Sequence, residues 1–281
     1  MMRDMFISLF ALMVFSTACK NDKNPIPPVA QKIPKKLETH GHVRTDNYYW
    51  MNQREDPAVV AYLEAENQYL KEVMKPTEAL QEELYLEIRS KIKEADQSVP
   101  YPDNGYYYYS RTVEGGEYSI QCRKKGSLDA PEEILLDINK MAEGYAYFAV
   151  GGGSVSPDNR ILAYAVDTVS RRNYSIYFKD LTTGELLPDI IPMTTGSVVW
   201  ANDNKTVYYV LRNEVTLRSE RIMKHTLGTP LSEDQEVYFE DDDTFSVYVT
   251  KSKSGKYLFI GSGSTLSDEY RYLDASNPDG E

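Results

Sequence analysis

A polar turn followed by an apolar run is the clearest pattern in the chain. Residues 155–167 read VSPDNRILAYAVD. Pro157 presets φ at the first central position of a turn, and Asp158 and Asn159 carry side chains that close such turns onto their own backbone. The almost uninterrupted apolar run that follows predicts a β-strand covered on both faces.

This pattern recurs along the chain. Asp203 lies 45 positions after Asp158, and Gly255 lies 51 positions after Asn204. The further copies are residues 199–210 (VWANDNKTVYYV), residues 249–260 (VTKSKSGKYLFI) and a looser one at residues 101–109 (YPDNGYYYY). Repeats of about 40 to 50 residues indicate solenoids or propellers. Several short strand-like runs and turns fill each interval, which favours propeller blades. A β-sandwich is the alternative, because sandwiches also place turns at short intervals.

The repeats predict a mostly β fold with about four propeller blades over residues 100–281. After Ile260 the last copy has only residues 268–273 as a further strand, and then a turn at residues 277–280. We therefore expect an incomplete propeller whose last blade stops before its outer strands. Such an open arc leaves sheet edges uncovered, which is an aggregation liability, and we do not expect it to be stable alone.

Residues 29–99 have a helical pattern and predict an α-helical arm before the blades. Asp56 and Pro57 form an N-cap and first-turn pair, and Pro76 ends the run. A second helix is expected to start near Thr77. The predicted apolar faces are Val60, Leu63, Asn67, Leu70 and Met74 on the first helix, and Leu80, Leu84, Ile88 and Ile92 on the second. Both faces need a partner to bury them.

The first residues indicate export. Residues 1–18 combine Arg3, an apolar run and small residues at the end, which is typical of a signal peptide and too short for a spanning helix. Cys19 directly after Ala18 resembles a bacterial lipobox, although Ser16 stands where a branched apolar residue is usual. We expect lipid attachment at Cys19, a tether over residues 19–28 and a periplasmic or outer-membrane lipoprotein. A plain cleaved signal is the alternative.

Composition and charge limit the classes of molecule that the chain is expected to bind. The chain has 281 residues, 41% of them hydrophobic and 26% charged, so we expect a packed core. Its net charge of −12 argues against nucleic acid as a partner, because phosphates are repelled. The charge is compatible with a cationic peptide, although acidity also serves solubility alone.

Several motifs follow one another in order along the chain. They are residues 37–50 (LETHGHVRTDNYYW), 60–67 (VAYLEAEN), 100–101 (PY), 106–111 (YYYYSR), 126–133 (GSLDAPEE) and 199–206 (VWANDNKT). With these motifs, the chain from Pro28 to Glu281 resembles the oligopeptidase B branch of the prolyl oligopeptidase family of serine peptidases. The resemblance implies a seven-bladed propeller joined to an α/β-hydrolase domain, with the arm packed on that domain. It also implies short peptides as substrates, cleaved after Lys or Arg.

The residues that this chemistry needs are missing from the sequence. A nucleophile elbow requires G-x-S-x-G, which occurs nowhere in the chain. The glycine-serine stretches at residues 151–154 and 261–264 are interpreted as bends, and the first lacks the ending of a phosphate loop. In the family the catalytic Ser, Asp and His belong to the hydrolase region, so no catalytic role transfers to any residue here.

The remaining candidate residues give no catalytic or metal site. His40 and His42 have no cysteine or carboxylate cluster at ligand spacing, and His225 falls inside a predicted blade strand. Residues 241–243 (DDD) are interpreted as a solvated loop, with attraction of Lys or Arg as the alternative. Cys122 is interpreted as a small packing residue. We expect no cofactor and no metal.

Two functions follow as hypotheses. The first is the arm and peptide-gating propeller of a secreted serine oligopeptidase whose catalytic domain is missing here, inactive alone. The second is a stand-alone lipoprotein propeller that binds a peptide or protein.

Overall fold

The structure is a computed structural model and describes residues 25–280. It divides into two compact units, one ending at Ile92 and the other beginning at Lys93, whereas the sequence pattern placed the boundary between residues 99 and 100. Residues 1–24, which include the expected signal peptide, Cys19 and most of the expected tether, lie outside the described part. Within residues 25–280 the structure has no helix with the length and apolarity needed to cross a bilayer.

The first unit opens with a β-hairpin that the sequence pattern did not predict. Strand β1 (Lys35–Thr39) pairs antiparallel with β2 (His42–Asp46). His40 and Gly41 form the two-residue turn with φ of 52° and 78°, both positive as a tight primed hairpin turn requires. A 3₁₀ turn follows at Tyr49–Asn52. The α-helical arm expected over residues 29–99 therefore begins with a short hairpin, and its helices follow from Pro57 onward.

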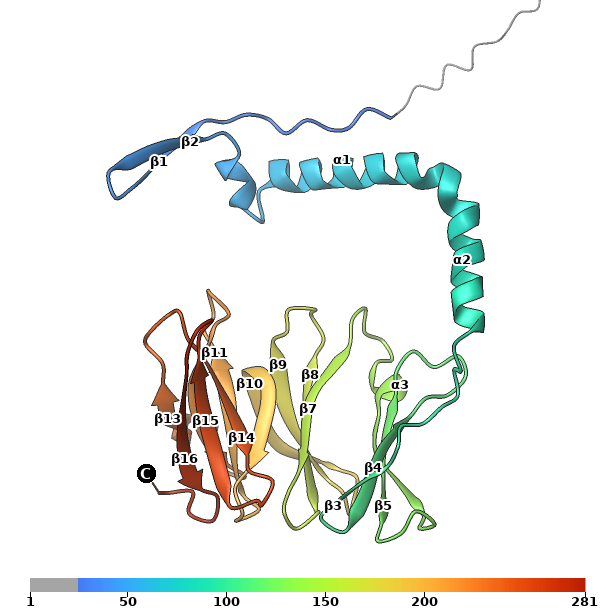
Figure 1. The fold of residues 1–281 in the computed structure, drawn as a ribbon, viewed down its shortest axis with the longest axis vertical. Coiled ribbons are helices and arrows are strands. Elements are labelled where there is room, and N and C mark those ends of the chain that lie inside the picture. The colour runs from blue at the N-terminus through green and yellow to red at the C-terminus, as the bar shows by residue number, and fades with distance from the viewer. Residues whose placement is uncertain (1–24, 281) are drawn as a thin grey trace, which may run out of the picture. The chain divides into compact units, whose positions relative to one another are not determined.

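Two helices complete this unit. Helix α1 (Pro57–Met74) starts at the predicted cap, because the Asp56 carboxylate accepts a hydrogen bond of 2.8 Å from the Ala58 backbone N–H. A 3₁₀ turn at Lys75–Thr77 joins it to α2 (Glu78–Ser90), and the chain bends sharply there (Figure 1). Val59 is the only buried residue among residues 25–92. The predicted apolar faces, including Leu63, Leu70 and Ile88, are exposed and find no partner within the unit.

The second unit is a series of antiparallel sheets that stand next to one another in chain order (Figure 1). Blade 1 contains β3 (Tyr101–Asp103), β4 (Tyr106–Arg111), β5 (Ile120–Lys125) and β6 (Glu132–Asp137). Blades 2 and 3 contain β7 (Ala149–Val155), β8 (Ile161–Asp167), β9 (Tyr174–Asp180), β10 (Leu186–Trp200), β11 (Thr206–Arg212), β12 (Ser219–Thr226) and β13 (Gln235–Phe239). Blade 4 contains β14 (Ser246–Lys251), β15 (Tyr257–Gly263) and β16 (Asp268–Asp274). Short helical turns occur at α3 (Ile138–Met141) and at Leu231–Glu233, neither of which was predicted.

The four repeats occupy equivalent places, as the sequence predicted. Each polar turn leads into the second strand of its blade, and these strands are β4, β8, β11 and β15. Asn159 and Asn204 have φ of 65° and 61°, and Gly255 has 71°, so corresponding turn positions share the left-handed conformation. Blade 4 has three strands, as expected for an arc whose last blade lacks its outer strand.

The two middle blades are not separate four-stranded sheets, which corrects the prediction. Strand β10 has 15 residues and joins them into one seven-stranded sheet. Its first half pairs with β9 as the outer strand of blade 2, and its second half pairs with β11 as the inner strand of blade 3. The bend between the halves lies at Met193 and Gly196, whose φ values of 61° and 89° let the strand turn without a break.

Both glycine stretches lie within strands and not at bends between strands, although β7 has a register shift between Val150 and Gly153. Gly261 and Gly263 belong to β15, which pairs on both sides without a register shift. Gly152 belongs to β7, and a Cβ there would come within 2.5 Å of the Gly196 carbonyl oxygen. A glycine at this position lets the inner strands of blades 2 and 3 approach each other closely.

The second strands are covered on both faces because each lies between two neighbouring blades. In β8, Leu162 and Tyr164 belong to the core cluster shared with blade 1, whereas Ala163 and Ala165 belong to the cluster shared with blade 3. Strand β11 divides in the same way, with Val207 facing blade 2. This two-sided burial explains the nearly uninterrupted apolar runs of the sequence.

The polar turns also join neighbouring blades through hydrogen bonds. Asn104 donates its side-chain N–H to the Pro157 carbonyl at 2.7 Å, and the Asn204 side chain accepts from the Asp158 backbone N–H at 2.8 Å. Asn202 donates to the Gly255 carbonyl at 3.0 Å. Each blade is thus attached to the next at the same edge of the unit.

Candidate functional site

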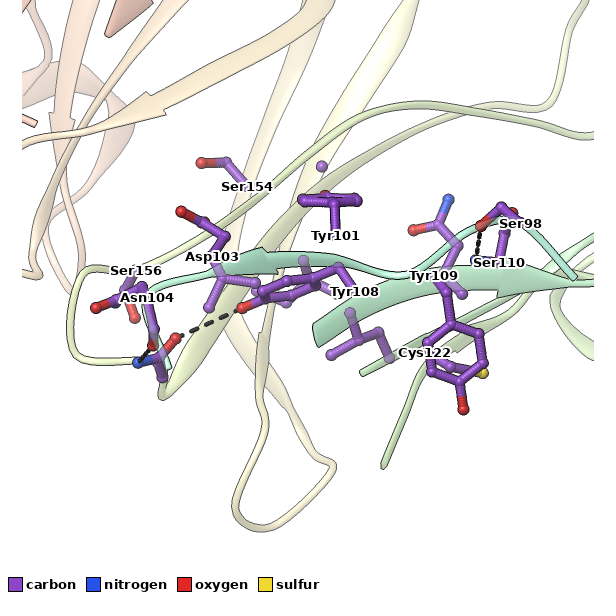
Figure 2. Close-up of a pocket in the computed structure, with 16 residues that line it drawn as sticks. Ser98, Tyr101, Asp103, Asn104, Tyr108, Tyr109, Ser110, Cys122, Ser154 and Ser156 are labelled. Carbon is purple, nitrogen blue, oxygen red and sulfur yellow. Dashed lines mark hydrogen bonds between the residues drawn. The ribbon is translucent and has the colours of Figure 1, made fainter. Parts of the chain in front are cut away.

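A cavity of about 450 Å³ lies between blade 1 and blade 2. Its walls come from β3, β4 and β5 on one side and from β7, β8 and the connecting turn on the other (Figure 2). The side chains that matter below are Tyr101, Asp103, Tyr108, Ser154 and Asn159. Its size is within the range of small-molecule and peptide side-chain pockets.

The hairpin of β3 and β4 positions the main side chains. Asn104 and Gly105 have φ of 43° and 81°, so Asp103 and Tyr106 face each other across a two-residue turn. Side chains alternate along a strand, which places Tyr101 and Asp103 on one face of β3. Figure 2 shows both side chains on that face, with the Asp103 carboxylate extending toward Ser154.

Tyr101 and Tyr108 form an aromatic pair beside this carboxylate. Their ring centroids are 5.7 Å apart with an interplanar angle of 24°. Burial, followed by the Asp103 charge, raises the pKa of Tyr101, and burial raises the pKa of Tyr108. Both hydroxyls therefore stay protonated at neutral pH and can donate hydrogen bonds.

Asp103 is the only charged residue that lines the cavity. Within residues 25–280 no hydrogen bond or ion pair engages its carboxylate. The buried cation of blade 1, Arg123, donates from Nε to Glu133 at 2.7 Å and from Nη1 to the Asn159 carbonyl at 3.1 Å. The cavity thus carries one uncompensated negative charge.

Cys122 is buried in β5 at the wall of the cavity, with 1% of its surface exposed. This agrees with its interpretation as a packing residue. Burial, with the Glu132 charge second, raises the pKa of the thiol to about 11. At pH 8 only about one thiol in a thousand is ionised, and the thiolate is the reactive form.

We therefore expect Cys122 to resist thiol reagents in the folded chain. In a Cys19→Ser variant, which leaves Cys122 as the single thiol, DTNB at pH 8 should not react in buffer and should label one thiol per chain in concentrated urea. Stoichiometric labelling within minutes in buffer would contradict the burial of β5.

The other predicted residues lie elsewhere. His40 and His42 belong to the β1–β2 hairpin. Residues 241–243 are exposed, as predicted, and Asp242 accepts hydrogen bonds from the backbone and side chain of Thr244 at 2.9 and 2.7 Å. Cys19 lies outside the described residues.

His225 lies in β12, as predicted, and is held in a buried polar network. Its Nδ1 is 2.6 Å from Asp234 Oδ1 and its Nε2 is 3.1 Å from Asp189 Oδ1. The Tyr209 hydroxyl donates to Asp234 at 2.6 Å, and the Gly228 N–H donates to Asp189 at 2.7 Å. With both ring nitrogens bonded to carboxylates, His225 is a structural residue that joins blade 3 to the outer strand of blade 2.

The described residues contain no arrangement for covalent catalysis. Across residues 25–280 no serine or cysteine side chain is hydrogen-bonded to a histidine. No group of three or more His, Cys, Asp and Glu side chains in this range is arranged to hold a metal ion. The cavity offers hydroxyls, aromatic faces and one carboxylate, which suit noncovalent binding of a ligand.

Several residues that line the cavity, among them Asn159, Ser154 and Cys122, were named from the sequence, but it was not predicted that they share a cavity with Tyr101 and Asp103. The signal for Tyr101 and Asp103 was the Asp-Asn-Gly turn between two tyrosine-rich runs, which predicts a tight hairpin. That hairpin places Tyr101 and Asp103 on one face, but the cavity itself arises from the neighbouring blade.

Comparison with known proteins agrees with this architecture. The family model described as "Prolyl oligopeptidase, N-terminal beta-propeller domain" matches residues 27–281. The chain is 42% identical over 269 residues to "Dipeptidyl aminopeptidase BI" of Pseudoxanthomonas mexicana, covering 90% of this chain and 37% of the relative. It is 35% identical over 258 residues to "Protease 2" of Moraxella lacunata, covering 89% of this chain and 37% of that relative.

Solved structures show the same relationship. Oligopeptidase B from Leishmania major superimposes with a TM-score of 0.84 at 31% identity, over 92% of this chain and 38% of that one. The chain thus spans less than two-fifths of the length of each of these three proteins. The matching family model, the order of the blades and these relatives together show that the chain belongs to the prolyl oligopeptidase family, of which it carries the N-terminal β-propeller domain.

Proposed function

We propose that this chain is the arm and peptide-gating propeller of a secreted serine oligopeptidase and that it has no peptidase activity by itself. The observation that carries the proposal is the match of residues 27–281 to the propeller domain of the family. The lack of a G-x-S-x-G turn in the sequence supports the expected lack of peptidase activity, because a serine nucleophile on an α/β-hydrolase needs that turn.

The exposed apolar faces of the arm support a role in contact between domains. Leu63 and Leu70 on α1 are 52% and 56% exposed, and Ile88 on α2 is 61% exposed. Burying such side chains contributes about 1.5–3 kcal/mol each. We propose that an α/β-hydrolase domain covers these faces.

A turnover assay tests the lack of activity. The purified chain is incubated with fluorogenic peptides that end in Arg or Lys and with a peptide that carries a neutral residue at the same place. We expect no release of fluorophore above the buffer blank. Release that follows the chain through purification and resists inhibitors of contaminating proteases would contradict the proposal.

Cleavage after Lys or Arg is proposed for the enzyme to which such a propeller belongs. The similarity to an oligopeptidase B supports this, and the similarity to a protein named a dipeptidyl aminopeptidase supports peptides as the substrate class. Comparing Arg, Lys and neutral peptides with a form of the protein that contains the hydrolase domain tests it, since equal turnover of all three would contradict a basic preference.

We also propose export and lipid attachment at Cys19, which places the domain on the periplasmic face of a membrane. The sequence of residues 1–19 supports this. Labelling of bacteria with an alkyne fatty acid should mark the chain and not the Cys19→Ala variant, and equal labelling of both would contradict it.

A further inference from the structure

The cavity between blades 1 and 2 has the chemistry of a cation-binding site. Asp103 supplies one negative charge, and no cation lines the cavity to neutralise it. Arg123 lies directly across from Tyr108 in the sheet, is 3% exposed, and interacts with Glu133, with a backbone carbonyl and with the Tyr108 hydroxyl. It does not itself line the cavity. The net charge of −12 on the whole chain adds to the attraction for cations.

Two tyrosines stand beside this carboxylate. Tyr101 is 60% exposed, whereas Tyr108 is 9% exposed, and the two rings are stacked. A cation over an exposed tyrosine face is attracted by the ring quadrupole. The raised pKa values of both tyrosines keep these rings uncharged at neutral pH.

Other residues that line the cavity offer polar groups that can hydrogen-bond a guanidinium or an ammonium group. The Ser154 hydroxyl has no hydrogen-bond partner within residues 25–280 and lies on the side toward which Asp103 points (Figure 2). The Asn159 side-chain oxygen accepts a hydrogen bond of 3.5 Å from the Tyr108 hydroxyl. A volume of about 450 Å³ holds one long side chain together with part of a peptide backbone.

We propose that Asp103, Tyr101 and Tyr108 form a subsite that binds a cationic group of a peptide, either a guanidinium or ammonium side chain or a free N-terminal ammonium. The inference deepens the proposed function by giving the propeller a recognition role of its own. The charge of the ligand is held by Asp103, and its apolar stem lies against the Tyr101 ring. Binding is weak, because Asp103 remains in contact with solvent.

Direct binding to the full chain tests the subsite without any need for turnover, so its failure is distinct from a failure of the proposed function. The probes are Nα-acetyl-arginine amide, its neutral analogue Nα-acetyl-citrulline amide, and glycine amide, each titrated while NMR shifts of the chain are followed. We expect saturable binding of at least one cationic probe and at least about tenfold weaker binding of the citrulline compound. Tighter binding of the arginine probe assigns the site to a side chain, and tighter binding of glycine amide assigns it to a peptide N-terminus.

Single substitutions test whether Asp103 supplies the negative charge that binds the cationic probe. Asp103→Asn removes the negative charge without breaking any bond within the described residues, and we expect it to weaken binding of the cationic probe about tenfold. Tyr101→Leu should weaken it about two- to fivefold, because the cation–π contribution is lost. The matched control is Asp129→Asn, an exposed aspartate of the same blade that does not line the cavity, and it should leave binding unchanged.

Three results would overturn the inference. They are equal binding of the arginine and citrulline probes, unchanged binding after Asp103→Asn, and an equal loss from Asp129→Asn. The third would mean that the general negative charge of the chain attracts the probe. Circular dichroism of each variant confirms that its fold is retained, and Tyr101→Leu provides an independent readout if Asp103→Asn alters the hairpin.

Discussion

Replacing Asp234 by alanine is expected to destabilise the propeller unit by about 3–5 kcal/mol, because it removes a carboxylate that two buried side chains use as their hydrogen-bond partner. The Asp234 carboxylate is 3% exposed and accepts hydrogen bonds from His225 and Tyr209, both of which remain buried without it. A buried donor that loses its acceptor cannot recover the loss from water. Urea unfolding followed by circular dichroism measures the change.

Two control variants separate this network from ordinary surface effects. Tyr209→Phe removes only the hydroxyl and should cost about 1 kcal/mol. Asp243→Ala lies in the exposed acidic run and should change the free energy of unfolding by less than about 0.5 kcal/mol. If Asp234→Ala costs no more than Tyr209→Phe, the Asp189–His225–Asp234 network does not hold blades 2 and 3 together.

Replacing Trp200 by alanine is expected to cost about 3–5 kcal/mol, through loss of apolar contacts and the cavity that remains. Trp200 is 1% exposed, and its indole packs edge-on against Phe178 with ring centroids 6.0 Å apart. Its Nε1–H also donates to the Ser154 carbonyl at 2.9 Å, which connects the inner strands of blades 3 and 2.

The matched control is Trp50→Ala, since the chain has only two tryptophans. Trp50 belongs to the first unit, where its Nε1–H donates to the Gln31 carbonyl at 2.9 Å. We expect this variant to leave the urea midpoint of the propeller unit unchanged, and Trp200→Ala to lower it strongly. Equal midpoints for the two variants would contradict the placement of Trp200 in the core between blades.

The repeated strands could be predicted from the sequence because strands buried on both faces have uninterrupted apolar runs. Residues 161–166 are apolar at every position, since one side of β8 faces blade 1 and the other faces blade 3. The turns before them use Asn and Gly in the left-handed conformation, which few other residues adopt at low cost. Local chemistry and tertiary burial agree at these positions.

The long strand β10 and the first hairpin could not be predicted in the same way. In β10 the two halves pair with different blades, and the strand contains Pro188 and Pro192, which lack the N–H that strands use for pairing. In the first hairpin, the two-residue turn at His40 and Gly41 was a weak signal because the flanking strands are mostly exposed and polar.

The candidate site was the least accessible to sequence reasoning. Tyr101 and Asp103 are recognisable as one face of a strand, but the wall opposite them comes from β7 and β8, about 50 residues later in the chain. A cavity between two blades depends on how the blades pack, which a local pattern does not contain. The lack of a catalytic serine turn, by contrast, is a local feature and was visible at once.

Hydrogen exchange followed by mass spectrometry tests the central claim most directly, namely that four spaced repeats build four successive blades. Strands β4, β8, β11 and β15 are each paired on both sides. The account predicts slow exchange in all four, and faster exchange in the sheet edges β3, β13 and β16. Fast exchange in any one of the four repeated strands, or slow exchange that follows a different spacing, would contradict it.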